Sequence, residues 1–233
     1  MRALLVDDER LARSGLRRLL SSHDDVTIVG EAANADEALV QIQRLQPDVV
    51  FLDVEMPGRS GLELLEDLED LPAVVFTTAY EDYAVRAFEV SALDYLLKPI
   101  AAERLEAALD KLRKISGPKN AGPGHERRVF VRDGERCWII ALEEIRVLES
   151  EGNYTRVYFG GNRPLIYKSL NALEARLDPA IFFRASRSHI VNLRDIQSLE
   201  TQAAGGLVAT LTGGIKIGIS RRQSRKLREL MSL

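Results

Sequence analysis

The stretch VVFLDVEMPG, residues 49–58, decides the fold of the first half of the chain. Its four leading apolar residues are typical of a strand that is buried on both faces, and this run ends on the carboxylate of Asp53. Met56, Pro57 and Gly58 then favour a turn. A carboxylate at the end of a buried strand is costly unless another group needs it there, so Asp53 is the first candidate for a functional residue.

Similar apolar runs recur through the first 115 residues, and helix-period segments such as RLARSGLRRLLSS lie between them. The expected strands are residues 3–6, 26–29, 49–52, 73–77 and 94–97. Strands that alternate with helices in this way are typical of βαβ units with short connections. We therefore predict an α/β doubly wound fold with a five-stranded parallel sheet.

The segment SGPKNAGPG, residues 116–124, has no apolar anchor and predicts a linker. The charge changes sign there, since residues 1–120 carry 14 Lys and Arg against 23 Asp and Glu, whereas residues 121–233 carry 18 against 12. Short alternating runs with glycine-containing turns follow, and they predict a mostly antiparallel β domain. Its two helical patterns are residues 167–177 and 220–230, with Ser220 as a plausible N-cap of the second.

We therefore expect a first domain at residues 1–116, a linker at 117–126 and a second domain at 127–233. Cys137 is the only cysteine, which excludes an intrachain disulfide and a cysteine-based zinc site. No apolar run approaches the roughly 20 residues that would cross a bilayer, and the N-terminus lacks a secretory signal pattern. These features favour a cytoplasmic protein without a membrane partner.

Polar residues follow the expected strands of the first domain at the same end. They are Asp7, Asp8, Asp53, Thr78 and Lys98. In an open parallel sheet these ends meet at the crevice where ligands bind, although a single polar residue there often only caps a strand. Neighbouring carboxylates raise one another's pKa unless a cation is present, and Mg²⁺ suits a site with few carboxylates. A carboxylate, a metal, a hydroxyl and a lysine together can accept a phosphoryl group.

The motifs LLVDDE, FLDVEMPG, TTAY and DYLLKP, in this order, resemble the receiver domain of bacterial two-component response regulators over residues 1–116. The resemblance implies a flavodoxin-like fold in which Asp53 is the phosphoacceptor. It also implies that Mg²⁺ is bound by Asp8, Asp53 and the backbone carbonyl of Glu55, with Asp7 helping through water. Thr78 and Lys98 would hold the phosphoryl oxygens, Tyr95 would be the aromatic switch, and the Lys98–Pro99 bond would be cis.

The same resemblance implies a sensor histidine kinase as phosphoryl donor and a homodimer on phosphorylation. The dimerising face would include Tyr83, Arg86, Ala87 and Phe88, although Phe88 can equally be a core residue. A phosphatase of the dehalogenase type also places an Asp nucleophile after a strand, but it needs Asp-x-Asp, and this chain has Glu55 at the second position. We therefore expect no enzyme beyond slow self-dephosphorylation, and Ser186 near His189 lacks a recognisable orienting partner for a triad.

The second half concentrates basic residues in FFRASRSHIVNLRDI, residues 182–196, and in RRQSRKLR, residues 221–228. Phosphate contacts need Lys or Arg, and Asn or Arg can read base edges, but a basic helix face is usually only solvated. These segments, with ESEGNYTRVYF and YKSLNALEARL, resemble the LytTR DNA-binding domain over residues 127–233. That likeness implies a β fold whose loops, rather than a recognition helix, enter the major groove of double-stranded promoter DNA.

By this resemblance Asn192 and Arg222 are the best candidates for base contacts. Lesser candidates, more typical of phosphate contacts, are Arg187, Thr155, Lys168 and Ser169. The chain departs from the family pattern at Ser186 and His189, which weakens any claim about the base that is read. Asn192 can also be a turn residue.

The sequence thus predicts a response regulator of the LytR/AlgR type that binds direct repeats in promoter DNA and regulates transcription. An alternative is a receiver-controlled protein-interaction module that does not bind DNA. An RNA-binding antiterminator fits less well, since such regulators carry a helical output domain and this one reads as β.

Overall fold

The computed structural model describes residues 1–68, 70–79, 94–115, 127–134, 136–202 and 205–230. The chain divides into two compact units, Met1–Ile140 and Ala141–Leu233, which are described separately below. Among the described residues, no helix is long and apolar enough to cross a membrane.

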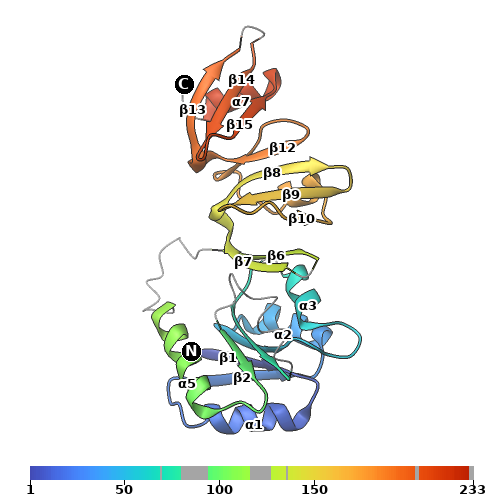
Figure 1. Cartoon of the computed structure of the whole chain (residues 1–233), viewed down its shortest axis with the longest axis vertical. Helices are drawn as coiled ribbons and strands as arrows, with labels where there is room; N and C mark the ends of the chain where they lie inside the picture. The colour runs from blue at the N-terminus through green and yellow to red at the C-terminus, as the bar shows by residue number, and fades with distance from the viewer. Residues whose placement is uncertain (69, 80–93, 116–126, 135, 203–204, 231–233) are drawn as a thin grey trace. The chain divides into compact units, whose positions relative to one another are not determined.

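The first unit is built on a five-stranded parallel sheet in the order β2-β1-β3-β4-β5, which confirms the predicted doubly wound fold (Figure 1). The order reverses between β1 and β3, so the loops after these two strands open onto the crevice at the switch point. The strands are β1 (Arg2–Val6), β2 (Thr27–Ala32), β3 (Val49–Asp53), β4 (Ala73–Thr78) and β5 (Asp94–Leu97), and the helices are α1 (Arg10–Leu20), α2 (Ala35–Leu45), α3 (Gly61–Asp67) and α5 (Ala102–Ile115).

Strand β3 is buried along its whole length because helices cover both faces of the sheet. Val50 and Leu52 belong to the core under α2 and α3, whereas Val49 and Phe51 belong to the core under α1 and α5. This alternation follows from the two-residue period of a strand. It explains why the run before Asp53 is apolar at every position.

A hairpin of β6 (Arg128–Asp133) and β7 (Arg136–Ala141) packs against the α3 side of the first unit. The Leu71 backbone N–H donates to the Arg128 carbonyl at 3.2 Å, and Arg132 forms an ion pair with Glu66 at 3.2 Å. Cys137 is buried in the core under α2 and α3. The compact unit therefore runs past residue 116. The predicted linker lies outside the described residues, so the domain boundaries stay a prediction.

The second unit is antiparallel throughout its described strand pairs, as predicted (Figure 1). One sheet has the order β10-β9-β8-β12-β11 and the other has the order β13-β14-β15. The elements are η1 (Leu142–Glu144), β8 (Ile145–Glu151), β9 (Tyr154–Phe159), β10 (Leu165–Ile166), α6 (Leu170–Glu174), β11 (Phe182–Arg184), β12 (His189–Asn192), η2 (Leu193–Asp195), β13 (Ile196–Thr201), β14 (Leu207–Leu211), β15 (Lys216–Ile219) and α7 (Arg221–Leu230).

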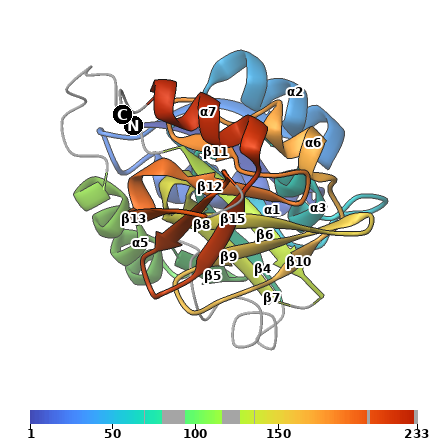
Figure 2. The same cartoon turned by 90° about the horizontal axis from the view of Figure 1, so that it is seen from above.

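Both predicted helices of this unit form, but with different lengths. Helix α7 follows Ser220, whose hydroxyl accepts a hydrogen bond from the Gln223 backbone N–H at 3.4 Å. Leu227 of α7 is fully buried in the core that β14 and β15 contribute to. Figure 2 shows α7 and β15 of this unit from above. Helix α6 is shorter than the predicted 167–177, since it runs from Leu170 to Glu174 and Ser169 caps its start.

Candidate functional site

Three carboxylates meet at the crevice end of the parallel sheet. Asp7 and Asp8 follow β1, and Asp53 is the last residue of β3. One ligand oxygen from each lies within 4.8 Å of the others. Asp7 and Asp53 are buried, whereas Asp8 is exposed. A buried pair of this kind needs a cation, and the geometry suits a hard metal ion bound by oxygen ligands.

The same cavity collects the other predicted residues of the phosphoacceptor site. It has a volume of about 640 Å³ and is open on one side. Thr78 ends β4, and Lys98 follows β5, which places both on the rim that the sequence predicted. The cavity is lined by the predicted residues Asp7, Asp8, Asp53, Glu55, Thr78 and Lys98.

Lys98 supplies the positive charge of this site. Its Nζ donates to Asp53 Oδ2 at 2.6 Å and lies 2.7 Å from Asp7 Oδ2. Burial works to lower the pKa of Lys98, but the bonds to the two carboxylates outweigh it and raise that pKa. Burial also raises the pKa of Asp53, and Lys98 offsets this only in part. The Lys98–Pro99 bond is cis, as the resemblance implies.

Glu55 and Tyr95 occupy different surroundings. The Glu55 backbone N–H donates to Asp53 Oδ1 at 3.2 Å, so the turn after β3 curls back over the carboxylate. The Tyr95 ring is exposed on β5, with the Arg104 guanidinium 5.8 Å from its centre. Tyr95 is therefore not among the residues that line the cavity. The predicted dimer residues Tyr83, Arg86, Ala87 and Phe88 lie outside the described residues.

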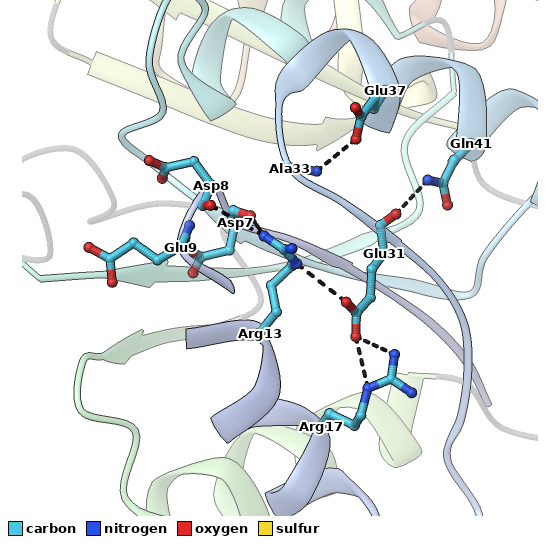
Figure 3. Close-up of polar contacts among 9 residues, drawn as sticks. All are labelled: Asp7, Asp8, Glu9, Arg13, Arg17, Glu31, Ala33, Glu37 and Gln41. Atoms are coloured by element: carbon cyan, nitrogen blue, oxygen red, sulfur yellow. Dashed lines mark hydrogen bonds and ion pairs between the residues drawn. The ribbon is translucent and has the colours of Figure 1, made fainter. Parts of the chain in front are cut away.

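Asp7 and Asp8 follow β1 in a segment that we call the acidic loop. Arg13 of α1 binds the backbone of this loop (Figure 3). The Arg13 guanidinium donates to the Asp7 carbonyl at 2.6 Å and to the Asp8 carbonyl at 3.3 Å. It also pairs with Glu31 of β2 at 3.3 Å, and Arg17 donates to the same Glu31 at 2.9 Å. Arg13 could not be predicted from the sequence, because its position in a helix gives no sign of which carbonyls its side chain reaches.

The start of α3 lies directly against the end of β3, next to Asp53. Ser60 caps this helix, and Glu63 completes a reciprocal capping box. The Gly61 backbone N–H donates to the Val54 carbonyl at 3.0 Å. An ideal Cβ at position 61 would lie 2.1 Å from the Asp53 carbonyl oxygen. Only glycine permits this close approach without moving the backbone.

The predicted DNA contacts of the second unit separate into buried and exposed groups. Asn192 is 2% exposed, and its amide donates to the Glu143 and Ile145 carbonyls at 2.9 and 3.1 Å. Its side-chain oxygen accepts from the Arg194 backbone N–H at 2.9 Å. Thr155 is fully buried and donates to the Lys168 carbonyl at 2.7 Å. In this conformation both side chains hold loops together, and their DNA contacts stay predictions.

The remaining candidates lie nearer the surface. Arg222 at the start of α7 and Arg187 between β11 and β12 are exposed. Ser169 is exposed and caps α6, and Lys168 is half-buried. Two exposed arginines on separate segments could each reach a phosphate or a base edge. They are the members of the predicted set that fit a nucleic-acid surface as they stand.

Ser186 and His189 have an orienting partner, Glu149, that could not be recognised from the sequence. His189 Nε2 lies 3.5 Å from Glu149 Oε1 on the neighbouring β8. The other ring nitrogen, Nδ1, lies 3.0 Å from Ser188 Oγ and 3.3 Å from Ser186 Oγ. Both hydroxyls therefore share the ring nitrogen opposite the one that faces the carboxylate. The group joins β8 to the segment around Arg187.

Comparisons with known proteins cover both units. The family model of the response regulator receiver domain matches residues 3–110, and that of the LytTr DNA-binding domain matches residues 135–232. The transcriptional regulatory protein BtsR of Salmonella typhimurium is 35% identical over 241 residues, with 100% of both chains covered. BtsR of Escherichia coli K12 and the sensory transduction protein LytT of Enterococcus faecalis are each 34% identical over 242 residues, again with 100% of both chains covered. The chain therefore belongs to the two-component response regulators of the LytR/AlgR family, which join a receiver domain to a LytTR DNA-binding domain.

Proposed function

We propose that Asp53 accepts a phosphoryl group from a sensor histidine kinase and that this event controls the binding of promoter DNA. The observation that carries the proposal is the cluster of Asp7, Asp8 and Asp53 within 4.8 Å, with Lys98 on two of its members. A carboxylate can attack phosphorus only if the charge that gathers on the phosphoryl oxygens is neutralised. The crevice has the residues for this.

Mg²⁺ fits this donor set, since three carboxylates and a backbone carbonyl are hard oxygen ligands. Asp8, Asp53 and the carbonyl of Glu55 would hold the ion directly, and Asp7 would act through water. The bound ion would neutralise charge on the transferring phosphoryl group. Lys98 already lies beside the oxygen of Asp53, so it is placed to bind a phosphoryl oxygen after transfer.

The signal would then pass from Thr78 and Tyr95 to a homodimer. Phosphorylation adds negative charge at the rim, and Thr78 would move toward it. Tyr95 is exposed on β5, and its inward rotation would accompany that movement. We propose dimerisation on phosphorylation, a cytoplasmic location and no enzymatic turnover beyond slow self-dephosphorylation.

For the output unit we propose that Arg222 and Arg187 meet the DNA first. Their exposure supports this, and the relatives named as transcriptional regulatory proteins support a role in transcription. Asn192 and Thr155 would hold the loops beside the DNA-binding surface in place. A base contact by Asn192 would require its present hydrogen bonds to break. The match of residues 135–232 to the LytTr DNA-binding domain supports this function over the protein-interaction alternative, which predicts no retention of any genomic DNA fragment.

The phosphoacceptor is tested by labelling with acetyl phosphate or a phosphorylated kinase in the presence of Mg²⁺. Asp53→Asn should abolish labelling, because the amide cannot act as the nucleophile. Glu55→Gln is the matched control, since only its backbone carbonyl is proposed as a ligand and its side chain is exposed. Labelling of Asp53→Asn at the wild-type rate would refute the assignment.

The DNA surface is tested by fluorescence anisotropy at several salt concentrations. Arg222→Ala should weaken binding and, if it contacts a phosphate, lower the slope of log K against log salt by about 1. Arg228→Ala, an exposed arginine near the other end of α7, serves as the control. Equal affinity and specificity in Arg222→Ala and the wild type would remove Arg222 from the surface.

A further inference from the structure

Arg184, the last residue of β11, is an arginine that the proposed function does not use. Its side chain is only 15% exposed, although the residue stands in the basic segment that was predicted to approach DNA. A cation as sheltered as this one must be paired and hydrogen-bonded. Its partners therefore indicate what it does.

All three guanidinium nitrogens of Arg184 have partners. Nε donates to the Ser186 carbonyl at 2.7 Å, and Nη2 donates to the Arg187 carbonyl at 2.7 Å. Nη1 donates to Glu174 Oε2 at 2.8 Å and to Asn171 Oδ1 at 3.2 Å, both on α6. The planar fork of an arginine can make such bonds in fixed directions, and a lysine cannot. Arg184 thus ties α6 to two successive carbonyls of the turn.

The opposite side of this turn is closed by further hydrogen bonds. The backbone N–H groups of Ala185 and Ser186 donate to the His189 carbonyl at 3.0 and 3.2 Å. The Ser188 N–H donates to Ser186 Oγ at 3.2 Å, and the Ser188 carbonyl accepts from the Ser150 N–H at 2.8 Å. The backbone on both sides of Arg187 is consequently fixed, while the Arg187 side chain is exposed.

We propose that Arg184 is a positioning residue for DNA binding, which fixes the turn at residues 185–188 so that Arg187 is presented to the DNA. Arg184 itself would not touch the DNA. This inference rests on the proposed function of the second unit and adds a residue to it. The physical gain is preorganisation, because a side chain on a fixed turn loses less conformational freedom when it binds.

A direct contact and a positioning role make different predictions for lysine. If Arg184 acted through its charge on a phosphate, Arg184→Lys would restore binding. If it positions the turn, Arg184→Lys should bind nearly as weakly as Arg184→Gln, since one ammonium cannot reach two carbonyls and Glu174 together. We expect Arg184→Gln to weaken binding on the order of tenfold. This is about the cost in affinity of ordering one side chain and its turn on binding.

The decisive experiment is a double-mutant cycle on the full chain, phosphorylated with acetyl phosphate and Mg²⁺. The probe is a fluorescein-labelled duplex made from the genomic fragment that the wild-type chain retains most strongly. Arg187→Ala should weaken binding, and adding Arg184→Gln to it should change the affinity by less than about twofold, because the two residues act through one contact. A further tenfold loss in the Arg187→Ala background would overturn the inference, and so would restored binding in Arg184→Lys.

Two controls separate this outcome from misfolding and from failure of the proposed function. Arg146→Gln removes an arginine of the same unit that pairs with Asp195 at 3.7 Å, and it should bind like the wild type. Hydrogen exchange should be faster in residues 185–188 of Arg184→Gln while the rest of the second unit keeps its protection. If the wild type retains no fragment, the proposed function fails, and unchanged exchange at the turn would overturn the positioning role independently.

Discussion

One loop in each unit is held by an arginine that donates to its backbone carbonyls, yet the first loop carries one buried carboxylate, Asp7, beside the exposed Asp8, whereas the second carries an exposed arginine. Arg13 holds the acidic loop of the first unit, and Arg184 holds the turn that carries Arg187 in the second. In the first loop the carboxylate of Asp7 points into the structure and is buried. In the second turn the guanidinium of Arg187 is exposed.

The difference reflects what each region is proposed to bind. A phosphoryl group and a metal ion are small, so the site must place several charged atoms at fixed distances inside a crevice. A DNA duplex is large and brings its own surface, so a fixed backbone and a free side-chain tip are enough. The first region therefore depends on compensated buried charge, and the second depends on the order of its backbone.

The largest expected effect tests the buried charge of the first region. Lys98→Ala leaves Asp7 and Asp53 without their shared cation and should lower the free energy of unfolding by about 3 kcal/mol in metal-free buffer. Added Mg²⁺ should restore part of the loss. Lys111→Ala is the control, since Lys111 also pairs with a buried carboxylate, Asp94, but is half exposed. Urea unfolding measures both, and equal losses would show that burial of the pair is not what matters.

The next effect tests whether Asn192 supports the structure of the second unit while Arg222 lies on its exposed DNA-binding surface. Asn192→Ala removes three hydrogen bonds, one of them buried and two part-buried, so we expect a loss of about 2 kcal/mol in the free energy of unfolding. Arg222→Ala should change it by less than about 0.5 kcal/mol. Chemical denaturation is the measurement. An unchanged stability in Asn192→Ala, together with lost DNA binding, would place Asn192 on the contact surface instead.

The hydrogen bonds from Arg13 to the acidic loop predict an effect on Mg²⁺ affinity that is smaller than the two stability effects above. Arg13→Gln should weaken Mg²⁺ binding about tenfold, as is typical when a group that orients metal ligands is removed. Arg17→Gln is the matched control, because the guanidinium of Arg17 donates to the same Glu31 carboxylate, whereas that of Arg13 also donates to the loop carbonyls. Calorimetric titration with Mg²⁺ compares the two variants. Similar losses in both would attribute the effect to net charge.

The smallest effect tests the hairpin that packs on the first unit. Burial raises the pKa of Cys137 from 9.0 to about 11. The folded state therefore binds this proton more tightly than the unfolded state, and the contribution is present below pH 9 and lost as the pH rises toward 11. Between pH 8 and pH 10 the wild type should lose about 1 kcal/mol relative to Cys137→Ala. A constant difference between the two would show that burial does not raise the pKa of the Cys137 thiol.

The site residues that lie at the ends of parallel strands could be predicted from the sequence. The residues that reach their partners through a long side chain could not. Asp7, Asp53, Thr78 and Lys98 were predictable because the ends of parallel strands meet at one edge. Arg184 was not, since a long side chain can end almost anywhere until the fold is known. Local pattern also could not show whether the amide of Asn192 bonds to protein or to solvent.

The hairpin shows the same limit at the level of packing. The alternating runs RVFVR, residues 128–132, and CWIIAL, residues 137–142, predict strands, and the structure has strands at Arg128–Asp133 and Arg136–Ala141. Alternation does not say which core a strand joins, and Cys137 joins the core of the first unit although the family model of the DNA-binding domain covers it. Predicting this would have required knowing that Leu71 and Glu66 offer a surface there.

Gly61 carries a consequence for evolution. Any side chain at this position would push α3 away from the carbonyl of Asp53, so selection should reject substitutions there almost as firmly as at Asp53, the proposed phosphoacceptor. A record of accepted mutations would then show Gly61, which performs no chemistry, to be about as intolerant of substitution as Asp53. Intolerance of change near Asp53 would measure closeness to its backbone as well as participation in the reaction.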